Sequence, residues 1–375
     1  RSPAGAGTWT AIGAADTTAP YSATWDTTLV ADGLYDLRVV TTDNVGLVTN
    51  SALVTNVRVD NTNPTGSVTA PAASANVTGA AVSVTSDSAD TGSGVASAQF
   101  QRSPAGAGTW TAIGAADTTS PYAVSWDTTL VADGLYDLRV VTTDNVGNSF
   151  TSALVSNVRV DNTLPTNALS LGTVTPAGAA FQSGATVYYR GVALGNFQLT
   201  NAVADAGSGP ASSIFPALGG TVGGWTHTTQ TVSTPAGGPY VTTNNFAWPA
   251  AESASPTESV TSTDAAGNTS AATVLTFTND STAPTGSLTA PAASANVRGT
   301  AVSVTSDSAD AGSGVANAQF QRSPAGAGTW TAIGAADTTS PYAVSWDTTL
   351  VADGLYDLRV VTTDNVGNSF TSALV

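Results

Sequence analysis

The sequence offers few side chains that could carry out catalysis. It contains one histidine, His227, and neither cysteine nor lysine. A serine hydrolase would have to pair His227 with one of many serines and aspartates, and no serine lies in the turn motif of a nucleophile elbow. A glycoside hydrolase needs two carboxylates held across a cleft, which short, repeated loops do not offer. His227 itself lies in the alternating pattern Trp-Thr-His-Thr, which predicts a strand with this side chain facing solvent, so we expect no enzyme activity.

Aspartates are the second kind of side chain that could do chemistry. The chain has 26 acidic and 10 basic residues, a net charge of −16, and every acidic residue except Glu252 and Glu258 is an aspartate. Carboxylates grouped with amide and backbone oxygens are the ligands that Ca²⁺ prefers. Asp and Asn also form turns by bonding to their own backbone, so the residue types alone leave both roles open. The acidic balance opposes binding to nucleic acid and to anionic membranes.

The chain is a tandem repeat. The 54 residues from Arg102 to Val155 return unchanged as Arg322 to Val375, and a diverged copy begins at Arg1. Identity over such a length implies duplication, and each copy should be one structural unit that contacts its neighbours in the chain. Because the sequence begins inside a repeat, we expect it to be a window of a longer polypeptide.

Short acidic linkers that end in proline mark the predicted boundaries. Their sequences are Val-Asp-Asn-Thr-Asn-Pro at 59–64, Val-Asp-Asn-Thr-Leu-Pro at 160–165 and Asn-Asp-Ser-Thr-Ala-Pro at 279–284. Proline fixes its own φ and keeps the preceding residue extended, which makes a short, stiff junction. Four modules are predicted: the C-terminal part of a first module at 1–63, a second module at 64–164, a longer module at 165–283, and a last module at 284–375 that lacks its final strand.

The second module has the periodicity of β-strands. Apolar residues alternate with polar ones around Val68, 82–84, 96–100, 110–113, 122–126, 136–140 and 154–160. No segment has helical periodicity. About seven short strands separated by turns are typical of a β-sandwich. The longer module repeats the pattern, with extra residues at 219–224 and 231–240.

The expected strand order brings acidic loops together. If seven strands run antiparallel, three loops return to the pole at which the chain enters the module. Carboxylates from these loops and from the preceding linker would repel one another there, so a Ca²⁺ ion is predicted at each junction, with plain turn formation as the alternative. In the second module these loops carry Asp87, Asp90, Asp117, Asp144 and Asn145. The candidate ligands are Asp60, Asn61, Asp87, Asp90 and Asp144, then Asp161, Asn162, Asp205 and Asp264, then Asp280, Asp307, Asp310 and Asp364. None of these loops has the sequence of an EF-hand or a nonapeptide calcium repeat.

Three motifs resemble a known family. They are Asp-Gly-Leu-Tyr-Asp-Leu-Arg-Val-Val-Thr-Thr-Asp-Asn-Val-Gly-Asn at 133–148, Asp-Thr-Gly-Ser-Gly-Val at 90–95 and the Asn-Thr-x-Pro linker. They are similar to bacterial immunoglobulin-like repeats of large surface adhesins, modules close in shape to fibronectin type III domains. The resemblance implies an all-β fold, a tandem array of seven-stranded Ig-like β-sandwiches arranged end to end and stiffened by junction Ca²⁺. It also implies that Tyr136 is a tyrosine-corner residue and that Trp110 and Trp126 anchor the core or its edge.

Together these features predict a non-catalytic stalk or fibre region of a long extracellular, cell-surface protein of a bacterium. Two alternatives remain: a subunit of a self-assembling extracellular filament, and a ligand- or glycan-binding adhesin module that uses the loops of 165–283. The expected partners are neighbouring modules of the same chain, and other copies of the chain if it forms a fibre. No apolar run approaches the ~20 residues that a membrane helix needs.

Overall fold

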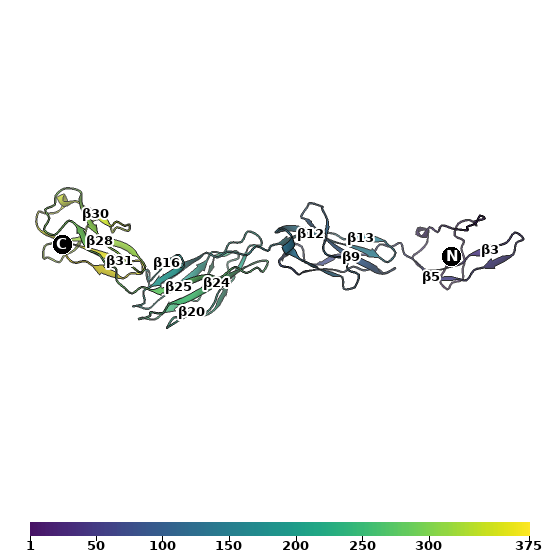
Figure 1. The fold of residues 1–375 in the computed structure, drawn as a ribbon, viewed down its shortest axis with the longest axis horizontal. Helices are drawn as coiled ribbons and strands as arrows, with labels where there is room; N and C mark the ends of the chain where they lie inside the picture. Colours follow the sequence, from purple (N-terminus) through teal and green to yellow (C-terminus); the bar gives the residue numbers. More distant parts are fainter. The chain divides into compact units, whose positions relative to one another are not determined.

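The computed structural model describes residues 1–375 and contains β-strands and three short 3-10 helices, with no α-helix (Figure 1). The predicted all-β class is confirmed. No helix is long and apolar enough to cross a membrane. The chain divides into two compact units, Arg1–Thr163 and Leu164–Val375, which are described separately.

The first unit contains the first and second modules. The first module has a three-stranded sheet in the order β1-β2-β5 and a hairpin of β3 and β4. These elements are β1 (Ser2–Pro3), the 3-10 helix η1 (Thr27–Leu29), β2 (Gly33–Leu37), β3 (Val40–Thr42), β4 (Val48–Asn50) and β5 (Val54–Val59).

The second module is a sandwich of two sheets. One sheet has the order β10-β9-β12-β14-β7, with β13 also paired to β12, and the other has the order β11-β8-β6. The elements are β6 (Val68–Ala70), β7 (Asn76–Val77), β8 (Val82–Ser86), β9 (Val95–Pro104), β10 (Thr111–Ala112), β11 (Ala123–Trp126), η2 (Thr128–Leu130), β12 (Gly134–Asp144), β13 (Ser149–Thr151) and β14 (Val155–Val160). Each predicted strand has a counterpart, and β7 and β13 are additional. All pairs are antiparallel except β14 with β7, which is parallel.

Alternation along the long strands builds the core of the second module. Phe100 on β9 and Leu138 and Val140 on β12 are fully buried between the sheets. Trp126 is buried and meets the ring of Tyr136 edge-on, with centroids 5.6 Å apart. The Tyr136 hydroxyl donates a hydrogen bond to the Ala132 carbonyl at 2.9 Å, which is the tyrosine-corner contact that the resemblance implies.

Trp110 lies at the edge of this sandwich. It is half-buried, and the Arg139 guanidinium lies 4.0 Å from its ring centroid. The Arg139 Nε atom also donates to Gln101 Oε1 at 2.8 Å. This cation–π contact recurs as Arg359 over Trp330 in the last module.

The longer module, in the second unit, is also a two-sheet sandwich. One sheet has the order β15-β18-β22 with β23 paired to β18, and the other has the order β16-β17-β25-β24-β19-β21 with β20 paired to β24. The strands are β15 (Leu169–Thr175), β16 (Ala180–Ser183), β17 (Thr186–Tyr189), β18 (Gly195–Asn201), β19 (Pro210–Phe215), β20 (Gly219–Gly220), β21 (Gln230–Val232), β22 (Tyr240–Val241), β23 (Phe246–Trp248), β24 (Pro256–Asp264) and β25 (Thr273–Asn279). Strand β17 pairs parallel with β25 over four residues.

The last module repeats the second, without the strands that correspond to β7 and β14. Its sheets have the orders β26-β27-β30 and β29-β28-β31-β32. The elements are β26 (Leu288–Ala290), β27 (Val302–Ser306), β28 (Val315–Pro324), β29 (Thr331–Ala332), β30 (Ala343–Trp346), η3 (Thr348–Leu350), β31 (Tyr356–Asp364) and β32 (Ser369–Thr371). Three separate core clusters lie inside the second, longer and last modules. The four-module division itself stays a prediction.

Candidate metal centre

Three aspartates from separate segments meet at the start of the second module. Asp60 follows β5, Asp90 lies between β8 and β9, and Asp144 ends β12. One carboxylate oxygen of each lies within 4.8 Å of those of the other two. The expected antiparallel strand order placed these three residues together, and the structure confirms that they are close. The binding of a Ca²⁺ ion by them remains a prediction.

Asp144 shapes the turn that follows β12. Its Oδ1 atom accepts hydrogen bonds from the backbone nitrogens of Val146, Gly147 and Asn148 at 3.0, 2.7 and 2.8 Å. Its Oδ2 atom accepts from Asn148 Nδ2 at 2.7 Å, and the same nitrogen donates to the backbone oxygen of Asp60 at 3.0 Å. Asn148 therefore ties this turn to the linker from the first module.

The other two carboxylates hold the loop that precedes β9. Asp60 Oδ2 accepts from Ser93 N at 2.5 Å, and Asp90 Oδ2 accepts from Gly94 N at 2.6 Å. A Cβ atom at position 92 would collide with the Asp60 carboxylate, so a larger residue there would displace this carboxylate from its bond to Ser93 N. The loop thus packs directly onto the group of acids.

The same arrangement recurs at the start of the last module, where Asp280, Asp310 and Asp364 form a group within 4.8 Å. Ser313 N donates to Asp280 Oδ2 at 2.6 Å, and Asn368 Nδ2 donates to the backbone oxygen of Asp280 at 2.9 Å. The two groups are equivalent by sequence and lie in different units, so the geometry follows from the repeat.

The two groups differ in the protonation behaviour of their most buried acid. Burial alone would raise the pKa of Asp144, but hydrogen bonds from the Asn148 side chain and from the turn amides outweigh it and hold that pKa below its ordinary value. Burial raises the pKa of Asp364 above its ordinary value, and the negative charge of Asp280 adds to the rise despite the bonds from Asn368. Repulsion between carboxylates thus contributes to the pKa of Asp364 in the last module.

Four other predicted ligands lie outside these groups. Asp87 Oδ1 accepts from Ser67 N, and Asp307 makes the equivalent bond in the last module. The Asn162 amide is turned into its own module, where Nδ2 donates to Thr128 O at 3.1 Å. Asn61 does the same in the first module. These residues support turns and strand ends.

The remaining three candidates lie on both sides of the division between units. Asp161 belongs to the first unit and accepts from Thr163 N at 3.2 Å. Asp205 and Asp264 belong to the second unit: Asp205 Oδ1 accepts from Gly209 N at 2.7 Å, and Asp264 folds the turn after β24 as Asp144 does after β12.

Sequence reasoning missed the residue that closes the end of the second module. Asp133 accepts hydrogen bonds from Asn162 N at 3.0 Å and from Thr163 Oγ1 at 2.7 Å. Desolvation alone would raise the pKa of Asp133, but the bonds from Thr163 and Asn162 together outweigh it and hold that pKa below its ordinary value. Asp32 makes the same bonds in the first module. The available signal was the recurrence of an Asp-Gly turn 29 residues before each Asn-Thr linker.

His227 is not placed as the strand pattern predicts. It is half-buried, and its ring stacks on Phe246 with centroids 3.8 Å apart, because it shares a face with the core residue Trp225. Burial lowers the pKa of His227, which keeps the ring neutral at physiological pH. The expectation of a solvent-facing histidine was therefore wrong.

The extra residues of the longer module contribute to its core. Trp225, Val232 and Tyr240, which lie in or beside these segments, are buried in the core cluster. Glu252 fixes the first segment by accepting a hydrogen bond from Gly224 N at 2.6 Å. These segments are therefore packed structure to a large extent.

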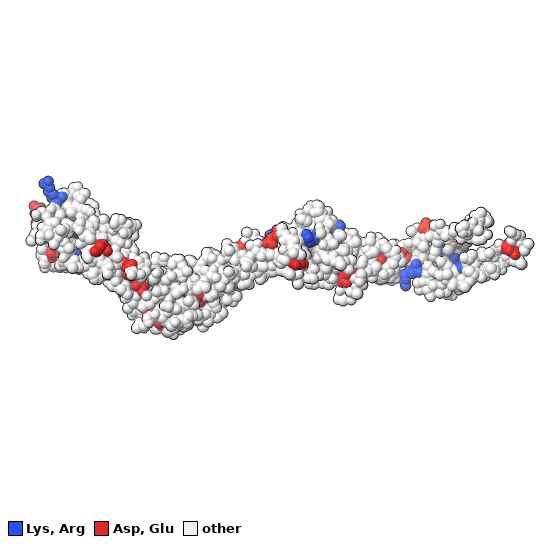
Figure 2. Space-filling model, viewed as in Figure 1, with Lys and Arg blue, Asp and Glu red and all other residues white.

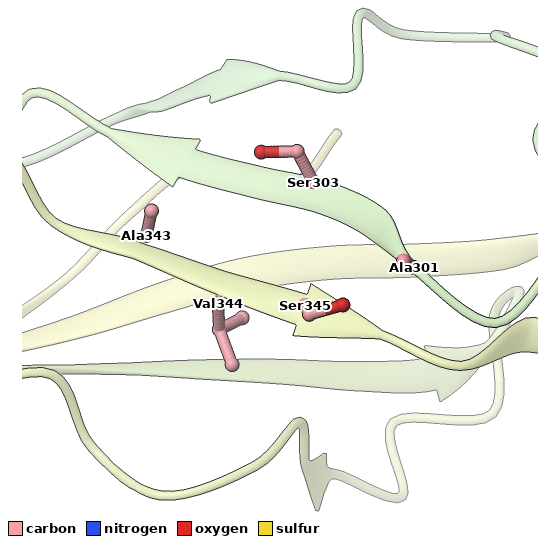
Figure 3. Close-up of a pocket in the computed structure, with 5 residues that line it drawn as sticks. All are labelled: Ala301, Ser303, Ala343, Val344 and Ser345. Carbon is pink, nitrogen blue, oxygen red and sulfur yellow. The ribbon is translucent and has the colours of Figure 1, made fainter.

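The surface offers little else for chemistry. Figure 2 shows a mostly uncharged face on which acidic patches are more common than basic ones. In the last module a shallow hollow of about 250 Å³ lies over β27 and β30, and Figure 3 shows that small side chains surround it. Its lining is Ala301, Ser303, Ala343, Val344 and Ser345, with no titratable group.

Comparison with known proteins agrees with this architecture. Residues 64–140 and 284–360 match the bacterial Ig domain family, and residues 120–189 match the bacterial Ig-like domain family of group 3. No curated protein matches the chain in sequence.

Several solved structures are similar at low identity. The fibronectin(III)-like modules of CbhA from Clostridium thermocellum are 17% identical, with 58% of this chain and 94% of that chain covered and a TM-score of 0.32. A tetra-tandem repeat from the extending region of a large adhesion protein is 16% identical, with coverages of 94% and 84% and a TM-score of 0.30. A Ca²⁺-stabilized adhesin with which an Antarctic bacterium binds ice is 19% identical, with coverages of 91% and 81% and a TM-score of 0.32.

At this level of similarity the solved structures add nothing to the family matches. The matches at 64–140 and 284–360 fall on the second and last modules and include Tyr136 of the tyrosine corner, and the match at 120–189 spans the end of the second module and the first strands of the longer one. The chain is therefore built from tandem bacterial immunoglobulin-like domains.

Proposed function

We propose that this chain is a non-catalytic spacer, the stalk or fibre region of a long extracellular bacterial surface protein. The observation that carries the proposal is the repetition of one self-contained sandwich whose polar side chains are engaged in its own turns. Asp133, Asp144 and Asn148 all bond to backbone or linker atoms in this way. Such a chain acts as a spacer that keeps the segments on its two sides a fixed distance apart.

Contacts between the first two modules support this role. The Arg58 Nη1 atom donates to Gly92 O at 2.7 Å, and Asn148 Nδ2 reaches the Asp60 backbone. Both bonds join the end of one module to a loop of the next. Neighbouring modules of the same chain are therefore the partners that the structure favours.

X-ray scattering by the chain 1–375 at several concentrations tests the spacer. A compact globule of this length would have a radius of gyration of about 21 Å. We expect a concentration-independent value well above that, from a monomer. A compact monomer would contradict the proposal. Growth of the particle with concentration would instead favour the filament, and specific binding of the folded chain on a glycan array would favour the adhesin module.

We further propose that the group of Asp60, Asp90 and Asp144 binds Ca²⁺, as does its equivalent in the last module. Carboxylate and backbone oxygens from irregular loops are the donors that this ion takes. The Oγ atoms of Ser93 and Ser313, beside the two groups, are buried without a hydrogen-bond partner. An ion would supply the missing partner and remove the repulsion between the acids. Asp161, Asp205 and Asp264 are proposed as a third set by sequence equivalence.

Calcium titration of thermal unfolding tests these sites. With a dissociation constant of 10⁻⁴ to 10⁻³ M, roughly 10 mM Ca²⁺ should stabilise a module by about 1.4–2.7 kcal/mol. Asp90→Asn keeps an oxygen for the Gly94 amide and removes the charge, so most of this gain should be lost. Without calcium, the same variant should be at least as stable as the parent.

Asp117→Asn is the matched control. Asp117 folds a turn by accepting from Thr119 N at 3.0 Å and Ala123 N at 2.8 Å, and it belongs to neither acidic group. Its calcium response should equal that of the parent chain. If calcium shifts none of the melting curves, the aspartates act as turn formers alone.

A further inference from the structure

A glutamate inside the longer module has no role in the spacer or in the acidic groups. Glu258 on β24 is 0% exposed, and both of its carboxylate oxygens lack a hydrogen-bond partner. The chain's other glutamate, Glu252, accepts three backbone hydrogen bonds. A fully buried carboxyl group without a partner is rare in folded proteins, because burying its charge is costly.

The surroundings of Glu258 are apolar. Alternation along β24 places it on the core-facing side, between Pro256 and Val260, which are also buried. Across the sheet it lies opposite Leu275 of β25. On the other side, the pairing of Gly219 with Thr257 brings in the segment that carries Leu218, which packs against the core.

No charged group of the neighbouring strands faces Glu258. The strands packed around it, β18, β19, β20, β21, β22, β23 and β25, carry Tyr240 as their one titratable side chain. The remaining titratable groups of this module are Tyr188 and Tyr189 on β17, Asp264 at the end of β24, Asp280 directly after β25, and Arg190, Asp205, His227 and Glu252 on connecting segments. Burial alone raises the pKa of Glu258 to about 8, with no contribution from a neighbouring charge.

We propose that Glu258 makes the longer module a pH-sensitive element of the array, one that responds to alkaline conditions. The sandwich packs around the protonated carboxyl group of Glu258. The ionised carboxylate is stable only when this part of the core opens to water. Alkaline conditions would therefore loosen β24 and its neighbours in this module alone.

The direction of the effect follows from the two protonation states. The folded-state pKa lies above the ordinary value of 4.5, so the folded module retains a proton that the unfolded chain has released. The contribution of the protonated Glu258 to stability is fully present below about pH 4.5 and is lost as the pH rises to about 8, where the loss levels off. Within this window the unfolding equilibrium constant should rise by up to about tenfold per pH unit.

Carbon-13 NMR of the chain 1–375 labelled at the glutamate Cδ tests the protonation state directly. The sequence has two glutamates, so two resonances are expected. One should titrate near pH 8 and disappear in Glu258→Gln. The other should titrate below the ordinary range, because hydrogen bonds hold the pKa of Glu252 down despite its burial. Two resonances that both titrate at or below pH 5 would overturn the proposal.

Denaturant unfolding from pH 6.5 to 9 tests the effect of Glu258 ionisation on stability. Burial lowers the pKa of His227, so that His227 does not titrate within this range. The parent chain should lose stability in the transition that Trp225 and Trp248 report, and Glu258→Gln and Glu258→Leu should remove the pH slope. Asp16→Asn, at an exposed acid of the first module, should leave the slope unchanged. If either Glu258 variant kept the parent's dependence of stability on pH, the proposal would be refuted. If both variants fail to fold, the NMR titration of the parent chain decides.

Discussion

Replacing Phe100 by alanine should unfold the second module at a much lower temperature and leave the other modules as they were. Phe100 is 0% exposed in the core cluster of this module. Truncating a buried phenylalanine costs about 3–5 kcal/mol, through lost burial and the cavity left behind. In a domain of this size the loss corresponds to a melting shift of at least about 12 °C. Calorimetry should show one displaced transition among several unchanged ones.

The repeat supplies its own control. Phe320 is the equivalent residue of the last module and is equally buried. Phe320→Ala should displace a different transition, and hydrogen-exchange peptides that contain Thr91 or its counterpart Ala311 can tell the two modules apart. If either substitution lowered every transition together, the modules would share one folding unit and the four-module division would be wrong.

Replacing Glu252 by alanine should destabilise the longer module by about 3 kcal/mol or more. This carboxylate is 9% exposed and accepts hydrogen bonds from Gly224 N at 2.6 Å and from Ser253 N and Ala254 N at 2.8 Å. Each bond to a charged acceptor contributes about 1.5–3 kcal/mol, and the amides left behind in a buried site add to the loss. The next residue after Gly224 is the core residue Trp225, so its fluorescence should report the release of the loop during denaturant unfolding.

Glu252→Gln is the matched variant, because it keeps the shape and one acceptor oxygen. Its loss should be about half that of Glu252→Ala. A loss below about 1 kcal/mol for the alanine variant would show that water replaces the carboxylate and that the first extra segment does not depend on it.

Strand alternation made much of the fold predictable. Tyr136, Leu138 and Val140 share one face of β12 because side chains two apart point the same way. Strands β7 and β13 escaped prediction because they are two and three residues long and form by pairing with distant partners. The prediction for His227 failed for a related reason. Alternation shows which residues share a face, but not which of the two faces packs into the core; here it is the face that carries Trp225.

The acidic groups were predictable only in part. Strand direction determines which loops share a pole, and so it placed Asp60, Asp90 and Asp144 together. It does not determine which backbone amide each carboxylate meets. Asp87 turns to Ser67 N, and Asn162 turns back to Thr128. The burial of Glu258 could not be predicted, because a polar residue in an alternating strand is expected to lie on the solvent-facing side.

The parallel pairs bear on how such a chain responds to pulling. In the second module β7 near the start pairs with β14 near the end, and in the longer module β17 pairs with β25. Tension on the two ends of a module draws parallel partners past each other, so their hydrogen bonds are loaded in shear and must rupture together instead of unzipping in turn. The register spans two residues in the second module and four in the longer one, so under traction the two kinds of module should yield at different forces.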